Sequence, residues 1–390
     1  MKRLYARTGG RVLLCALLAG AVLLLCAKWI SIAYLTNDDN AIAFALAGYQ
    51  TGEPYPYALF INCLLGYLVS GLYTLLPTVP WWAAVQLWLL FGSMTAIGAC
   101  LLRSFQRWGQ GPLLPVLLYG MLLLLLFLQP VAELTYTLTA AAAGAAGCAL
   151  VILAAGEAGN RRRALDILGA AFLLAAFLMR EETGFAALCF FALACAYRLL
   201  AGPGRKRAML LLVTVGALCG GAFLFNNTMQ TSVNGADFTS YFHYRERFTD
   251  YPRDAYEENP ELYASVGWDE PLYDLADQWC FLDERVNRDA LQTIVEQSSH
   301  VNKPTLTGAA RECLAMLEGG RPGRYVGAAA LGLLFYGLYL LLTNGKCGGL
   351  ALLAALCSVG GGCLLCLYLC LTGRFLYRSF QAVAIPALTC

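Results

Sequence analysis

Charge is scarce in this chain of 390 residues. Asp, Glu, Lys and Arg together make up 13% of the sequence, about half the share found in soluble globular domains. Hydrophobic residues make up 59%, and the mean hydropathy is +0.60. This composition excludes an ordinary soluble domain and indicates an integral membrane protein.

Several motifs of soluble enzymes are also missing. The sequence has no phosphate-binding P-loop, no glycine fingerprint for a dinucleotide, no HExxH zinc motif and no GxSxG nucleophile motif. No basic cluster with interleaved aromatic residues indicates a nucleic-acid partner. Soluble nucleotide chemistry and nucleic-acid binding are therefore not expected.

The 16 cysteines do not form a metal-binding pattern. Most of them lie in apolar runs, where Cys behaves as a small hydrophobic residue, and the Cys363/Cys366 pair has no His or carboxylate beside it. Two of them, Cys280 and Cys313, fall in the large polar loop. A disulfide between them is one option if that loop is extracytoplasmic.

Long apolar runs predict an all-α fold, a polytopic bundle of about nine transmembrane helices, since a membrane span needs about 20 apolar residues. The expected spans are 12–34, 81–102, 112–129, 137–156, 164–180, 184–200, 208–225, 325–343 and 348–371. The Gly- and Ala-rich stretch 139–147 predicts close helix packing.

One further apolar run, 58–76, is ambiguous, and loop charge decides how it is interpreted. If it does not cross the membrane, the N-terminus and the basic turns at 103–107, 161–163 and 205–207 all share one side, which the positive-inside rule places in the cytoplasm. The segment 36–80 is then interfacial or re-entrant on the outer side. The alternative is that 58–76 spans the membrane and another weak segment does not.

Three regions follow from this topology. Residues 1–225 form an N-terminal transmembrane domain, 226–323 a small helical extracytoplasmic loop domain, and 324–390 a C-terminal transmembrane segment. Within the loop, helices are expected at 271–283, at 287–299 and from Pro304 to Met316. The protein is expected in the cytoplasmic membrane of a bacterium with its N-terminus in the cytoplasm.

Asp38 and Asp39 are the most informative pair, because charges beside a membrane span are costly and seldom lack a role. Adjacent carboxylates partly out of water have raised pKa values, which suits a general base accepting a proton from a hydroxyl. Asp39 is slightly favoured as that base, and Asp38 is the second catalytic candidate. The alternative is that Asn37 or Asp38 only caps a helix over 41–47.

Other polar residues are expected on the same outer face as substrate-binding candidates. Arg180, Arg374 and Arg378 lie at the outer ends of spans, where an arginine suits a lipid-linked phosphate through its planar set of donors. Lipid head groups, or the acidic neighbours of Arg180, are the alternative partners. Glu133 lies in a very short outer loop, and is either a second acid of the cavity or an exposed turn residue.

Aromatic and basic residues gather at 241–247 in the large loop. Tyr244 and Arg245 are candidates for binding a sugar or a phosphate there. The alternative is that this stretch packs the loop against the membrane domain, since aromatic residues more often serve burial.

The acidic pair after the first span, the interfacial segment before the second span and the later large outer loop resemble the GT-C superfamily of polytopic glycosyltransferases. The resemblance implies transfer of a sugar from a polyprenyl-phosphate donor to a saccharide, lipid or protein acceptor at the outer membrane face, among membrane lipids. It implies Asp39 or Asp38 as the base, and Arg374 with Arg180 holding the departing phosphate. Some members use a divalent metal and others do not, so the cofactor stays open.

Two other functions compete with this interpretation. A transporter or flippase of a lipid-linked saccharide predicts polar residues in mid-span and repeated broken helices, whereas the charges here gather at span ends. A non-catalytic subunit of an envelope-polysaccharide system would use the acidic pair only as a helix cap.

Overall fold

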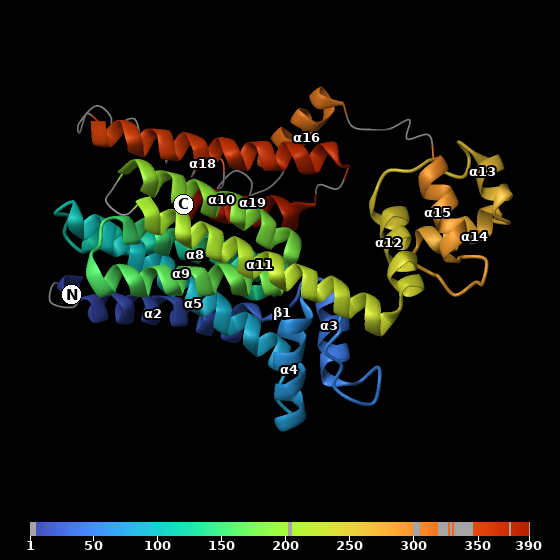
Figure 1. Cartoon of the computed structure of the whole chain (residues 1–390), viewed down its shortest axis with the longest axis horizontal. Helices are drawn as coiled ribbons and strands as arrows, with labels where there is room; N and C mark the ends of the chain where they lie inside the picture. The colour runs from blue at the N-terminus through green and yellow to red at the C-terminus, as the bar shows by residue number, and fades with distance from the viewer. Residues whose placement is uncertain are drawn as a thin grey trace. The chain divides into compact units, whose positions relative to one another are not determined.

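The computed structural model of the chain describes residues 5–201, 205–298, 305–318, 327, 330, 346–373 and 376–389 (Figure 1). Within these ranges the regular secondary structure is helical apart from one minimal pair of strands, β1 (Ala33–Tyr34) and β2 (Glu133–Leu134), which run parallel. The all-α prediction is therefore confirmed. The chain divides into two compact units, which are Met1–Asn226 with Met316–Leu365 and Tyr377–Cys390, and Asn227–Ala315 with Cys366–Leu376.

The first unit is a bundle of long helices that lie roughly side by side (Figure 1). Two π-helical turns, η1 (Cys26–Ile30) and η2 (Leu123–Phe127), interrupt the α-helices. The α-helices of this unit are α2 (Thr8–Leu25), α3 (Asn37–Ala47), α4 (Cys63–Leu75), α5 (Trp81–Arg107), α6 (Leu113–Leu122), α7 (Leu128–Ala132), α8 (Tyr136–Ala155), α9 (Gly159–Met179), α10 (Glu181–Ala201), most of α11 (Arg205–Asn234), most of α18 (Lys346–Leu371) and α19 (Tyr377–Thr389).

Seven helices in the described ranges are long and apolar enough to cross a membrane. They are Thr8–Ile30, Trp81–Arg107, Leu113–Ala132, Tyr136–Ala155, Glu181–Leu200, Arg205–Asn234 and Leu352–Leu371. Of the other two expected spans, 164–180 corresponds to α9, whose first turns carry Arg161, Arg162, Arg163 and Asp166. The span expected at 325–343 lies outside the described residues apart from Gly327 and Ala330.

Helix α8 lies at the centre of the first unit and is buried along almost its whole length. Its small residues let neighbouring backbones come close. A Cβ on Gly144 would meet the Ala187 side chain on α10, and a Cβ on Gly147 would meet Leu173 and the Gly169 carbonyl on α9. The close packing predicted for this Gly- and Ala-rich stretch is present.

Helices α3 and α4 run across the bundle direction rather than along it (Figure 1). Helix α4 has 13 residues, which at 1.5 Å per residue is about 20 Å, short of the ~30 Å hydrocarbon core. Its start is held by Asn62, whose side chain donates to Glu181 Oε1 (3.0 Å) and to the Ala222 carbonyl (3.0 Å). The prediction that 58–76 does not span agrees with this length and direction.

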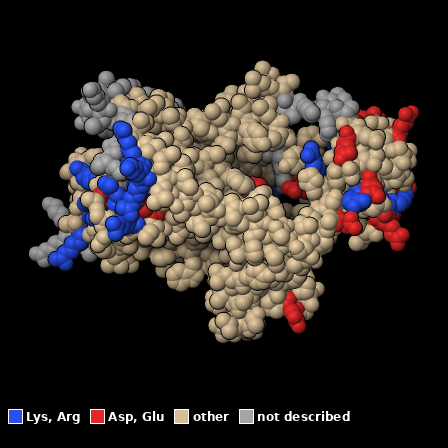
Figure 2. Space-filling model, in the orientation of Figure 1, with Lys and Arg blue, Asp and Glu red and all other residues tan. Residues whose placement is uncertain are grey.

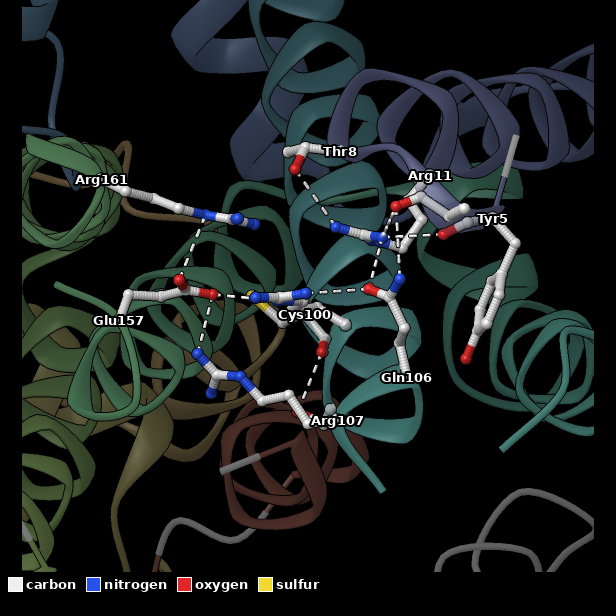
Figure 3. Close-up of polar contacts among 11 residues, drawn as sticks. Tyr5, Thr8, Arg11, Cys100, Gln106, Arg107, Glu157 and Arg161 are labelled. Atoms are coloured by element: carbon white, nitrogen blue, oxygen red, sulfur yellow. Dashed lines mark hydrogen bonds and ion pairs between the residues drawn. The ribbon is translucent and has the colours of Figure 1, made fainter. Parts of the chain in front are cut away.

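Basic residues collect at one end of the first unit (Figure 2). Glu157 is the anion at their centre, with ion pairs to Arg107 (2.7 Å) and Arg161 (3.6 Å) (Figure 3) and a third to Arg103 (3.0 Å). Burial raises the pKa of Glu157, but the arginines outweigh that effect and the net pKa is lowered. The buried Arg11 joins the cluster by donating to Gln106 Oε1 at 2.6 Å (Figure 3).

The basic turn at 205–207 meets α9 near the same cluster. Asp166 lies three to five residues after the basic positions 161–163 and forms ion pairs with Arg198 at 2.6 Å and Arg207 at 3.3 Å. Basic segments separated widely in the sequence therefore lie at one end of the bundle, as the loop-charge argument requires. Which side of the membrane this end faces stays a prediction.

The second unit is a small helical domain with its own apolar core around Phe248, Tyr263, Trp268 and Leu291. Three of its helices begin at a side-chain cap, in which Asn259, Asp269 and Asn287 accept a hydrogen bond from a backbone N–H of the first turn. Its helices are α12 (Ala236–Asp250), α13 (Pro260–Ser265), α14 (Glu270–Asp277), α15 (Arg288–Gln297) and most of α16 (Leu306–Glu318).

Two features of the structure depart from the expected elements. Helix α14 ends at Asp277 rather than near 283, because Trp279 has a positive φ of 66°, which a right-handed helix cannot contain. The C-terminal segment forms α19, whose residues from Phe380 to Ala387 are buried. This helix packs against α8 and α10, and its Ala387 carbonyl accepts from Ser358 of α18. The apolar pattern of this short helix was not recognised in the sequence.

Candidate functional site

The end of the first unit opposite the basic cluster brings together segments that are far apart in the sequence. Strand β1 follows the first span and pairs with β2, so that Ala33 lies opposite Glu133 and Tyr34 opposite Leu134. The Leu35 amide extends the pairing by donating to the Leu134 carbonyl at 2.8 Å. This pairing brings the chain that leads to Asp38 beside the short loop between α7 and α8.

Asp39 is buried completely and fully engaged by donors. Its Oδ1 accepts from the Trp82 indole (3.1 Å), the Gln86 amide (2.9 Å) and the backbone N–H of Tyr136 (3.2 Å). Its Oδ2 accepts from the Thr36 hydroxyl at 3.1 Å. One carboxylate therefore ties the first turn of α3 to α5 and to the first residue of α8.

Burial raises the pKa of Asp39 to about 6, even though its four donors act in the opposite direction. The raised pKa of Asp39 matches the expectation, and so does burial as its cause, but the neighbouring Asp38 does not contribute to the shift. Helix α3 begins at Asn37 with Thr36 at the N-cap position, rather than with Asn37 or Asp38 as the cap. Both aspartates lie in its first turn, where the helix dipole favours negative charge.

Asp38 has a different environment from its neighbour. Successive residues on a helix point about 100° apart, so Asp38 cannot share the buried position of Asp39. Its side chain is 33% exposed and lies 3.6 Å from Nη1 of Arg378, at the start of α19. The structure thus brings together an accessible carboxylate and one of the predicted phosphate-binding arginines.

Arg180 lies between α9 and α10 near the same position. Its guanidinium donates to the Thr137 hydroxyl, stands 4.8 Å from the centre of the Tyr136 ring, and forms an ion pair with Glu182 at 3.3 Å. Glu182 is 73% exposed, so this ion pair adds little to stability and an anion can compete with it.

Tyr136 is the residue about which these charges are arranged. Four charged groups lie close enough to act electrostatically on its hydroxyl: Arg180, Asp38, Arg378 and Glu182. Its backbone N–H holds Asp39, and its ring faces Arg180. Asp38, Arg180 and Arg378 are therefore grouped around one tyrosine, as a site at this end of the bundle requires.

Glu133 is exposed and accepts a hydrogen bond from Gln129 at 2.8 Å. Gln129 in turn accepts from Gln381 of α19 at 2.9 Å, and Gln381 also donates to the Tyr377 hydroxyl at 3.1 Å. Burial, followed by the charge of Glu133, raises the pKa of Tyr377 to about 12. This polar row continues the site along the start of α19.

The remaining candidates are not joined to this group. Arg374 lies outside the described residues. Tyr244 and Arg245 belong to the second unit, where the Tyr244 hydroxyl donates to Glu296 at 2.9 Å and the Arg245 guanidinium stacks on Phe242 at 4.6 Å from the ring centre. Both contacts lie within the second unit, so they show packing inside that unit and do not test the alternative that this stretch packs against the membrane domain.

Several residues of the site were not identified from the sequence. Tyr136, Thr137, Tyr377 and Gln381 each make a contact described above, and none stands in a recognisable motif. One signal was present, because Tyr136 and Thr137 directly follow the short Glu133 loop. The Tyr377–Gln381 pair gave no signal, since its role depends on the long-range packing of α19 against Gln129.

The described residues contain no group of three or more His, Cys, Asp or Glu side chains placed to hold a metal ion. The cysteines whose side chains the structure describes are free thiols, Cys280 and Cys313 among them, so the optional disulfide between these two is not formed. Comparison of the chain with protein-family profiles, with characterised proteins and with solved structures finds no match.

Proposed function

We propose that the chain is an integral membrane glycosyltransferase of the GT-C type, which moves a sugar from a polyprenyl-phosphate donor to an acceptor hydroxyl. The observation that supports this most is the pairing of the accessible Asp38 with Arg378, beside Arg180 and Tyr136. A base and two arginines close together are what transfer from a phosphate leaving group needs.

In the proposed reaction Asp38 accepts the proton of the acceptor hydroxyl. The acceptor oxygen forms a bond to the anomeric carbon while the bond from that carbon to the phosphate oxygen breaks. The bonding electrons leave with the polyprenyl phosphate, whose growing negative charge is met by Arg378 and Arg180. Planar guanidinium groups suit this task because they donate two parallel hydrogen bonds to a phosphate.

Asp39 has a positioning role in this proposal. Its oxygens accept from four donors and are shielded from solvent: Trp82 and Gln86 of α5, Tyr136 of α8, and Thr36 at the N-cap of α3 itself. An acceptor hydroxyl has no route to it without displacing one of these donors. Asp39 instead holds the first turn of α3 in place, and so sets the direction of Asp38 one residue earlier.

The contact between Arg378 and Asp38 also suggests an order, in which the donor binds before Asp38 accepts a proton. In the free protein Arg378 lies 3.6 Å from Asp38, which is beyond hydrogen-bond length. An arriving phosphate would attract Arg378 and leave Asp38 open to the acceptor. Binding of the donor would in this way prepare the base, which reduces the chance that Asp38 acts before the donor is present.

The test uses purified protein in lipid nanodiscs with a polyprenyl-phosphate sugar that is radiolabelled in the sugar. The proposal expects the label to leave the polyprenyl carrier and appear on an added saccharide, lipid or peptide acceptor. Label that stays on the carrier with every acceptor class, while the protein is folded, would overturn it. If the carrier instead moves between leaflets in sealed vesicles, the flippase alternative is supported.

A matched pair of variants shows whether the measured transfer comes from this protein or from a contaminating enzyme. Asp38→Asn removes the proposed base at nearly constant shape, and transfer should fall with it. Glu53→Gln neutralises an exposed acid in the same segment 36–80 that shares none of the contacts described for Asp38, and should leave transfer unchanged. Equal loss in both variants would point to a general effect of charge.

A further inference from the structure

Two cysteines of the second unit lie in direct contact. Cys313 is on α16, Cys370 is in the last turn of α18, and their sulfur atoms are 3.2 Å apart although the residues are 57 positions apart in the sequence. Cys370 is buried and Cys313 is half-buried. A disulfide bond is about 2.05 Å long, so the two sulfurs need to approach by only about 1 Å.

The surroundings hold both cysteines in this arrangement. Just after Cys370, Gly373 adopts a positive φ of 80° and packs so closely on Pro252 that a Cβ there would overlap the proline ring. The carboxylate of Glu312 also lies near enough to act electrostatically on the Cys370 thiol. The end of α18 therefore belongs to the same unit as the loop that carries Cys313.

Other partners for these thiols are less suitable. Cys366 lies one helical turn before Cys370 on α18, and a disulfide within one straight helix would distort its backbone. Cys280 follows α14, whereas the Cys313 sulfur contacts that of Cys370. A shared metal has no support, because the described part of the chain brings no third ligand to the pair.

We propose that Cys313 and Cys370 form a disulfide in an oxidising compartment. The thiolate of the more accessible Cys313 attacks a small-molecule or protein disulfide and releases one thiolate of that donor. The Cys370 thiolate then displaces the donor's second sulfur and closes the bond. Two protons and two electrons leave the cysteines, and the donor disulfide is reduced to two thiols.

This disulfide ties α16 of the large loop to the end of α18, which directly precedes the segment leading to Arg378. It does not depend on sugar transfer, and requires only that the loop is extracytoplasmic, since cytosolic thiols are kept reduced. Its failure and the failure of the glycosyltransferase proposal are therefore separate results.

The experiment uses the full-length protein in membranes isolated from cells. Acid quenching is followed by denaturation and alkylation of free thiols, then by reduction and labelling with a second, heavier reagent. Peptide mass spectrometry then shows which cysteines were oxidised. Trypsin separates the pair, because it cuts after Arg311 and Lys346, and the fragment that carries Cys313 contains no other cysteine.

The expected result is that Cys313 and Cys370 carry the second label and that their peptides are joined without reduction. Cys313→Ser and Cys370→Ser should each abolish the cross-link, whereas Cys280→Ser and Cys366→Ser should keep it. If both cysteines carry the first label in the wild-type protein, or if Cys313 is joined to Cys280, the proposal is overturned. The variants need not be fully active, because the wild-type protein alone decides this outcome.

Discussion

Asp39 affects stability in two ways: its oxygens accept hydrogen bonds from buried donors, and its charge is costly to bury. Replacement of Asp39 by Ala and by Asn should separate these two effects. Asp39→Ala leaves the Trp82 indole, the Gln86 amide and the Tyr136 backbone N–H without their shared acceptor. Each buried donor left unsatisfied costs about 1–3 kcal/mol, so Asp39→Ala should lower the free energy of unfolding by at least about 3 kcal/mol.

Asp39→Asn keeps an acceptor oxygen at the position of Oδ1, and its amide group can donate to the Thr36 hydroxyl. It also removes a buried charge. The pKa of Asp39 is raised from 3.8 to about 6, and this difference of roughly 2 units corresponds to about 3 kcal/mol between the two protonation states. The part of the stability that comes from protonation of Asp39 in the folded protein is therefore complete below pH 4 and is lost as the pH rises through about 6.

The assay is thermal unfolding of the detergent-solubilised protein, followed by intrinsic fluorescence at pH 4.5 and at pH 7.5. At pH 7.5, Asp39→Asn should be at least as stable as the wild type, and its advantage should shrink at pH 4.5. Other carboxylates titrate equally in both proteins, so their effects cancel in the difference. An Asp39→Ala variant as stable as Asp39→Asn, or a difference that does not change with pH, would refute the reasoning.

Three further predictions concern other parts of the chain. Arg378→Gln should raise the KM for the lipid-linked donor at least about tenfold, since it removes one of the two guanidinium groups that we propose bind the phosphate. An unchanged KM would count against that role. Glu157→Gln should lower the melting temperature at neutral pH, because it leaves three arginines without their anion. The pKa of Glu157 is lowered in the folded protein, so the difference between wild type and variant should fade as the pH falls below the ordinary glutamate value of about 4.3. Cysteines introduced at the exposed positions Thr51 and Ala164 should react with a membrane-impermeant maleimide from opposite sides of the membrane, after subtraction of labelling in the parent protein; reaction from the same side would contradict the topology.

The helical class and the grouping of basic turns could be predicted from the sequence, because both depend on local composition. An apolar run of about 20 residues has few alternatives to a helix in lipid. The positive charges at Arg103, Arg161 and Arg207 predicted that these segments share one side of the membrane. In the structure, the ion pairs of Glu157 and Asp166 bring them to one end of the bundle.

The site itself could be predicted only in part. The segment with Asp38 and Asp39 was identified by the cost of charge beside lipid, but the different environments of the two depend on Trp82, Gln86 and Tyr136, which lie far along the chain. No pattern within residues 37–40 distinguishes the buried carboxylate from the accessible one.

The thiol pair shows the same limit. Cys280 and Cys313 were grouped because both lie in the polar loop, whereas Cys370 was assigned to an apolar span. The structure places Cys370 at the end of that span, where α18 joins the second unit and meets Cys313. Contacts between a loop and a helix end 57 residues later have no local sequence signature.

The initial rate of sugar transfer by Asp38→Asn, compared with Asp39→Asn and the wild type in one set of nanodisc preparations, tests the central claim most directly. Loss of a general base lowers a rate by about 10²–10⁴-fold, so Asp38→Asn should lose at least about 100-fold, while Asp39→Asn should stay within about tenfold of the wild type. Full activity of Asp38→Asn, or an Asp39→Asn variant that is stably folded and as inactive as Asp38→Asn, would contradict the assignment of Asp38 as the base.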